Sequence, residues 1–128
     1  MNNIPSNLEA EQSVIGCLLS DAYSDNSRQA IDLLNEDSFY TSAHRIIFLL
    51  IKSRVEKKED VSLISITDEL ERINKLAQCG GFVYIAELIR SLISKANILA
   101  YVTILNKLGA TRAILKLSNQ IIDMSSSE

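Results

Sequence analysis

The chain has 128 residues, enough for one domain with a hydrophobic core. Hydrophobic residues make up 47% and charged residues 23%, which is typical of a globular protein and excludes a disordered one. The net charge of −3 argues against strong nucleic-acid binding, and we expect no apolar stretch to reach the ~20 residues that a membrane span needs. One proline and four glycines leave few turn residues, so the composition predicts an all-α fold.

The apolar spacing predicts a flexible lead-in at residues 1–6 and then a globule of about five helices over residues 7–93. The first helix is capped by Ser6 or Asn7 and ends near Ser20, and the second starts at Asp25 or Ser27. The remaining predicted helices begin after a cap at Ser42, cover about 67–76, and run from Phe82 to about Leu92 behind a Gly80-Gly81 turn.

The alternating residues 61–66 resemble a strand, but with no second strand to pair them we expect an extended lead-in to the fourth helix. The predicted core combines the inward positions of these helices with two aromatic residues of a connector at residues 35–40. The core residues that we predict are Val14, Leu18, Phe39, Tyr40, Ile47, Leu50, Leu70 and Leu88.

Ser94 is predicted to cap a long last helix over residues 94–124, with a frayed end at residues 125–128. At ~100° per residue, its apolar stripe changes sides halfway along. Before Gly109 the stripe contains Ile98, Tyr101, Val102, Ile104, Leu105 and Leu108. After Gly109 the same side carries Arg112, Lys116, Asn119, Gln120 and Asp123, and the apolar residues lie roughly opposite.

A straight helix on one core would keep one stripe, so either the helix breaks at Gly109 or its second half packs against something that this chain lacks. A glycine costs ~1 kcal/mol in mid-helix against alanine, which indicates a kink or a close helix contact at Gly109. We favour intermolecular packing, and hence an interaction protein. The predicted interface residues are Leu108, Ile114, Leu115, Ile121 and Ile122, with Tyr84 beside the glycine turn, a position where a core role is the commoner alternative.

The four glycines form no phosphate-binding loop, so nucleotide hydrolysis by these residues is excluded. The single histidine, His44, is expected to make a structural hydrogen bond near the start of the third helix rather than to act as a base. Helix dipoles and solvation suffice to explain the acids Glu9, Glu11, Glu69 and Glu71. The spacing of Cys17 and Cys79 matches neither a zinc site nor a disulfide framework, so we expect free thiols in the cytoplasm. Taken together, these residues lead us to expect no catalytic, cofactor or metal site in this chain.

Several motifs, taken in order, resemble the opening of replicative DNA helicases of the DnaB family. Ile4-Pro5 is followed by residues 8–16, LEAEQSVIG. Further matches along the chain are Phe39-Tyr40, His44-Arg45, Ile47-Phe48, Leu63, residues 68–70 (DEL), Gly80-Gly81, residues 84–88 (YIAEL), residues 96–98 (ANI), Tyr101 and Arg112. Each motif is weak alone, but together they cover nearly the whole chain and are specific. Departures from the family pattern occur at Ser38, Ser62, Cys79 and Gly109.

The resemblance implies the amino-terminal domain of a hexameric, ATP-driven 5′-to-3′ DNA helicase, in which a helical globule precedes a helical hairpin. This chain would hold the globule and the first arm of the hairpin. On this resemblance, we expect the ATP- and Mg²⁺-binding motor domain to lie outside these 128 residues. In the family, hairpins pair subunits into a ring of dimers, primase docks on this collar, and a helicase loader acts nearby.

A competing interpretation is a small helical DNA-binding or regulatory protein that works as a homodimer. Its basic face would be Lys107, Arg112 and Lys116 of the last helix, and its DNA binding would fall steeply with salt. A stand-alone enzyme is disfavoured, because the sequence shows no convergent set of reactive side chains.

Overall fold

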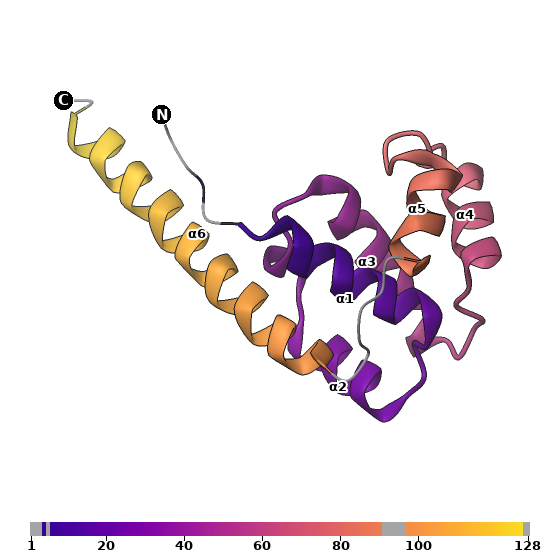
Figure 1. The fold of residues 1–128 in the computed structure, drawn as a ribbon. Helices are drawn as coiled ribbons and strands as arrows, with labels where there is room; N and C mark the ends of the chain where they lie inside the picture. The colour runs from indigo at the N-terminus through magenta and orange to yellow at the C-terminus, as the bar shows by residue number, and fades with distance from the viewer. Residues whose placement is uncertain (1–3, 5, 91–96, 127–128) are drawn as a thin grey trace.

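The computed structural model describes residues 4, 6–90 and 97–126 (Figure 1). These residues form an all-α fold without a strand, as predicted. The elements are α1 (Leu8–Ser20), α2 (Asp25–Leu33), the short 3₁₀ helix η1 (Glu36–Ser38), α3 (Ser42–Glu56), α4 (Leu63–Arg72), α5 (Gly81–Arg90) and α6 (Ile98–Ser126).

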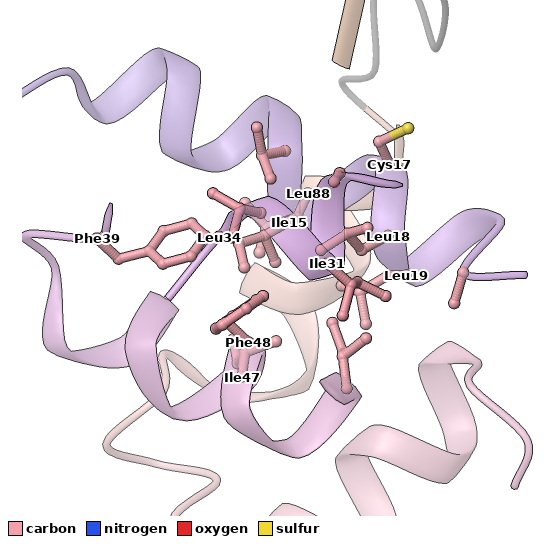
Figure 2. Close-up of a cluster of buried hydrophobic side chains, with 14 of the residues drawn as sticks. Ile15, Cys17, Leu18, Leu19, Ile31, Leu34, Phe39, Ile47, Phe48 and Leu88 are labelled. Atoms are coloured by element: carbon pink, nitrogen blue, oxygen red, sulfur yellow. The ribbon is translucent and has the colours of Figure 1, made fainter. Parts of the chain in front are cut away.

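Helix α1 lies at the centre of the globule and packs against α3, α5 and α6. Asn7 caps it by accepting a hydrogen bond from the Ala10 amide, which confirms one of the two predicted caps. Its buried side chains Ile15 and Leu18 meet Ile31, Leu34, Ile47 and Phe48 in one cluster (Figure 2). The central position of α1 explains why nearly every residue from Ala10 to Leu19 is buried or half-buried.

Most of the predicted core is confirmed, since Val14, Leu18, Phe39, Ile47, Leu70 and Leu88 are all buried. Phe39 packs against Phe48 with ring centroids 5.2 Å apart. Leu50 is half-buried at the edge of the core. Tyr40 was wrongly predicted as core: its side chain is 44% exposed, because the extended backbone after η1 turns neighbouring side chains to opposite sides.

Helix α4 begins four residues earlier than predicted and ends at Arg72, so the extended lead-in predicted for residues 61–66 is wrong from Leu63 onward, while Ser62 is extended. Ser62 accepts from the Ser65 amide while Ser65 accepts from the Ser62 amide, and this capping box starts the helix at Leu63. The alternation was misleading because Leu63, Ile66 and Leu70 also share one helical face. The shift also leaves Glu69 and Glu71 far from the helix start.

The Gly80-Gly81 turn before α5 is confirmed, with φ of +95° and +83°. A Cβ on Gly80 would lie 2.7 Å from a ring carbon of Tyr84, so both the backbone conformation and the space require glycine there. Helix α5 is described to Arg90, and its predicted end near Leu92 lies outside the described residues. The predicted cap at Ser94 and the helix start at residue 95 also lie outside them.

Helix α6 continues through Gly109 without a break, and it includes Ser125 and Ser126, which were predicted to fray. Its first half buries Ile98, Val102, Leu105 and Gly109 against the globule. The second half extends beyond the other helices and ends far from α4 and α5 (Figure 1). The alternative of a kink that returns this half to its own core is therefore wrong.

By length and hydropathy alone, α6 is apolar enough to cross a membrane, contrary to the sequence expectation. This criterion is weak, because core helices of soluble proteins also meet it. In this chain the first half of α6 packs on the globule, and Lys107, Arg112, Lys116 and Asp123 are distributed along the helix. We therefore interpret its apolar surface in terms of packing against protein.

Candidate protein-docking surface

The most prominent surface of the molecule is the second half of α6, residues 110–126, which we call the arm. Every arm residue except Arg112 is exposed. Six large apolar side chains on it are 46–74% exposed, and we call them the apolar arm face: Ile114, Leu115, Leu117, Ile121, Ile122 and Met124. A run of this kind on one element indicates an interaction site rather than ordinary surface.

Most of the apolar arm face points away from the globule. At ~100° per residue, Ile114 lies about 180° around the helix axis from Leu105, which is buried against the globule. The side of the arm that continues the buried stripe is polar, with Lys116 and Gln120. The globule therefore leaves most of the apolar arm face uncovered while α6 stays continuous, and Leu117, at the edge of this face, lines the hollow between the arm and the globule.

Four of the predicted interface residues, Ile114, Leu115, Ile121 and Ile122, are exposed on this face. Leu108 is half-buried at the edge of the globule. The interface prediction omitted Leu117 and Met124, which are also exposed on this face. Leu117 lies four residues before the predicted Ile121, so the helical spacing could have identified it.

The arm is attached to the globule through η1. The Asn106 side chain accepts from the Ser38 hydroxyl at 2.5 Å and donates to the Leu33 carbonyl at 2.9 Å. One turn further along, a Cβ placed on Gly109 would lie 2.5 Å from the Asp37 carbonyl oxygen. The close helix contact that the sequence suggested at Gly109 is thus with the backbone of η1.

Arg112 makes the outermost attachment. Its guanidinium donates to the Asp37 carbonyl at 2.7 Å and lies 5.6 Å from the centre of the Tyr40 ring. Because this side chain is held against η1, the basic face of the DNA-binding alternative loses one of its three members. A hollow of about 400 Å³ separates the arm from the globule here. It is lined by Glu36, Asp37, Phe39, Arg45, Gly109, Arg112, Ala113, Lys116, Leu117 and Gln120.

A buried polar network joins α1, α3 and α5 beneath this region. The Glu11 carboxylate accepts from His44 Nδ1 at 2.8 Å, from the Tyr40 amide at 2.8 Å and from the Thr41 amide at 3.2 Å. In the neutral imidazole, Nε2 then accepts from the Tyr84 hydroxyl at 2.6 Å. The structural hydrogen bond predicted for His44 is confirmed.

Solvation was the wrong explanation for Glu11, because its side chain is only 1% exposed. Burial raises the pKa of this carboxyl. The hydrogen bonds from His44, Tyr40 and Thr41 together lower the pKa by more than burial raises it, so the net pKa lies below its ordinary value. The charged carboxylate therefore holds the extended segment after η1 in place.

Tyr84 is half-buried, and its hydroxyl is engaged by His44 and by Gln12 Nε2 at 3.3 Å. This places it in the globule, within the network rather than on the arm, and the core alternative fits it better than the interface prediction does. Both cysteines are buried, and burial raises the pKa of the Cys79 thiol. In the described part of the chain, no three His, Cys, Asp or Glu side chains come together as a metal site.

Comparison with known proteins gives a consistent result. The sequence model of the DnaB-like helicase N-terminal domain family matches residues 3–107. The replicative DNA helicase DnaB of Pasteurella multocida (strain Pm70) is 35% identical over 118 residues, which are 91% of this chain and 25% of that protein. The DnaB of Buchnera aphidicola subsp. Baizongia pistaciae (strain Bp) is 34% identical over 119 residues, 93% of this chain and 25% of that protein. The chain thus spans about a quarter of the length of these relatives.

Two solved structures share the fold. The crystal structure of the N-terminal domain of DnaB helicase from Mycobacterium tuberculosis superimposes with a TM-score of 0.88 at 24% identity, covering 98% of this chain and 90% of that one. A structure of a DnaB-like replicative helicase and its interactions with primase gives a TM-score of 0.77 at 25% identity, covering 95% of this chain and 28% of that one.

Proposed function

Because the chain belongs to the DnaB-like helicase N-terminal domain family, we propose that it is the assembly and protein-docking domain of a hexameric, ATP-dependent replicative DNA helicase. In this proposal the motor that uses ATP and Mg²⁺ is a separate domain of the parent protein. The residues described above then have a structural and docking role in DNA replication in the cytoplasm, with no catalytic part.

The observation that carries the proposal is the apolar arm face. Burying a Leu or Ile side chain completely contributes about 1.5–3 kcal/mol. Six side chains that are each half to three-quarters exposed would therefore contribute roughly 6–10 kcal/mol per chain if covered. Association has costs of similar size, so a surface of this kind supports reversible pairing within a larger assembly.

We propose that a second copy of the chain covers this face. In a symmetric dimer each apolar arm face would lie on its counterpart, and a standard interface of ~1,600 Å² could be reached with parts of the globule. Primase would dock on the assembled domains, a proposal supported by the fold shared with a DnaB-like replicative helicase whose structure concerns its interactions with primase. A helicase loader is proposed as a further partner on the basis of the family resemblance.

Sedimentation equilibrium of the 128-residue chain tests the pairing. Leu115→Asp and Ile121→Asp each place a carboxylate on the apolar arm face, and twofold symmetry would bury two of them. We expect each variant to weaken self-association by at least ~100-fold. The matched control is Asn119→Asp, which adds the same charge at an exposed arm position outside the apolar arm face.

Circular dichroism should show that all these variants keep their helicity, because the substituted side chains lie outside the core. An unchanged dissociation constant for both Leu115→Asp and Ile121→Asp would contradict pairing through the arm.

A further inference from the structure

We propose that Gly109 is a positioning residue that sets the direction in which the arm leaves the globule. This inference rests on the proposed function in one respect: the direction of the arm would also determine the geometry in which two copies pair.

The contact at Gly109 is between two backbones. A Cβ there would lie 2.5 Å from the Asp37 carbonyl oxygen, 3.2 Å from the Asp37 carbonyl carbon and 3.4 Å from the Ser38 Cα. Backbone atoms cannot rotate away as a side-chain end can. Glycine is a poor helix former, and α6 neither kinks nor ends at this point, so close approach to η1 explains why glycine stands there.

Hydrogen bonds from residues before and after Gly109 also hold α6 against this part of the globule. Asn106, three residues earlier, bonds to Ser38 and to the Leu33 carbonyl. Arg112, three residues later, bonds to the Asp37 carbonyl. These contacts hold α6 against η1 over about two helical turns.

The attachment of the arm at η1 is narrow. Hollows of about 400 Å³ and about 180 Å³ lie along the contact, and Gly109 lines both. Residues 113–126 are all exposed. The buried first half of α6 sets the general course of the helix, and the strip from Asn106 to Arg112 is where the arm leaves the globule.

The η1 side of this contact is the more firmly held. Phe39, directly after η1, is buried against Phe48. The next two amides, of Tyr40 and Thr41, donate to the buried Glu11 carboxylate. A steric clash at Gly109 should therefore move α6 rather than η1.

The size of the movement follows from helix geometry. Restoring an ordinary contact requires α6 to lift by roughly 1 Å at Gly109, about 6 Å along the axis from the buried Leu105, at a rise of ~1.5 Å per residue. The resulting tilt is about 10°. At Met124, about 28 Å from Leu105, it displaces the arm by roughly 5 Å.

The test measures the distance between spin labels on the globule and on the arm. Labels at Asp68→Cys in α4 and Asn119→Cys on the arm use exposed positions, with the native Cys17 and Cys79 replaced by alanine. Dilution with excess unlabelled chain confines the measured distances to single chains, so the result does not depend on pairing.

We expect Gly109→Ala to shift the mean label distance by a few Å with unchanged helicity. The matched control Ala110→Gly puts a glycine at the neighbouring exposed position and leaves the contact with η1 intact, so its distance distribution should match the parent's. Gly109→Ala should also weaken self-association by at least ~10-fold, whereas Ala110→Gly should not.

An unshifted distance in Gly109→Ala would overturn the positioning role. A shifted distance with unchanged association would overturn the link to pairing. If Leu115→Asp and Ile121→Asp both leave association intact while Gly109→Ala shifts the distance, the proposed pairing fails and the positioning role stands.

Should Gly109→Ala lose its helical signal, Arg112→Met decides the question. It removes the outermost attachment without adding bulk, and we expect it to broaden the distance distribution. A distribution as narrow as the parent's would count against the proposal.

Discussion

Glu11→Gln gives the sharpest test of the buried network. In the folded chain both oxygens of Glu11 accept: Oε2 from the Tyr40 amide, and Oε1 from the Thr41 amide and His44 Nδ1. A glutamine keeps the shape but replaces one oxygen by an NH₂ group. Either orientation of that amide places a donor against a buried donor, and the negative charge is lost.

The expected cost is about 2–4 kcal/mol of unfolding free energy at pH 7. One buried donor left without an acceptor costs about 1–3 kcal/mol, and the loss of charge assistance in the remaining hydrogen bonds adds to it. Glu9→Gln is the matched control: Glu9 is exposed in the same first turn of α1, so its change should stay within ~0.5 kcal/mol.

The difference between the parent chain and Glu11→Gln should depend on pH. The folded-state pKa of Glu11 lies below the ordinary value of 4.5, so its stabilisation is fully present above that value and is lost as the pH falls through the lower folded pKa. The difference should be constant between neutral pH and about pH 5.5 and should narrow below about pH 4.5. The other carboxyls titrate in both chains, so their contributions cancel in the difference.

The difference in unfolding free energy is measured by urea unfolding, monitored by circular dichroism at each pH. One low chain concentration is used throughout so that association does not contribute. A Glu11→Gln variant within ~0.5 kcal/mol of the parent at pH 7 would refute the reasoning. A difference that stays constant down to pH 3 would show that the Glu11 charge is not what stabilises the network.

Three further predictions concern local features and use the same unfolding measurement. Tyr84→Phe removes the hydroxyl that contacts His44 Nε2, and we expect a loss of about 1–2 kcal/mol; no loss would mean that water replaces the hydroxyl freely. Gly80→Ala should cost more than Gly81→Ala, since both have positive φ but only Gly80 is crowded by the Tyr84 ring; equal losses would contradict this. Ser62→Ala should cost ~1 kcal/mol through the lost capping box, while Ser62→Asp keeps a cap and should be nearly neutral.

The main features of the docking surface could be predicted from the sequence because they follow from helical periodicity. The change of stripe at Gly109 depends only on ~100° per residue and on which residues are apolar. The structure confirms that Ile114, Leu115, Ile121 and Ile122 are exposed. Caps were less predictable: Asn7 was one of two candidates for α1, and the predicted cap at Ser42 was wrong, because Thr41 is the N-cap of α3.

The buried role of Glu11 and the contact at Gly109 could not be predicted, because both depend on residues far away in the sequence. Glu11 resembled any acid in the first turn of a helix, and only the arrival of His44 and the Tyr40 amide, about 30 residues later, makes it a buried acceptor. Likewise the partner of Gly109 is a carbonyl oxygen 72 positions earlier, at Asp37. No periodic pattern records such a contact.

Two local patterns also led to wrong predictions. The segment before α4 satisfies a strand-like alternation and a helical spacing at once, and the capping box at Ser62 decides between them. Tyr40 follows the buried Phe39, and the extended backbone there places the two side chains on opposite sides.

Pairing through the arm is tested most directly by backbone amide hydrogen exchange of residues 110–126 as a function of chain concentration. Every arm residue except Arg112 is exposed in the described structure, so the arm amides should exchange quickly in dilute solution. We predict that their exchange slows as the concentration rises through the dissociation constant, and that Leu115→Asp abolishes this protection. Arm exchange that is independent of concentration, in a chain whose globule remains protected, would contradict the account.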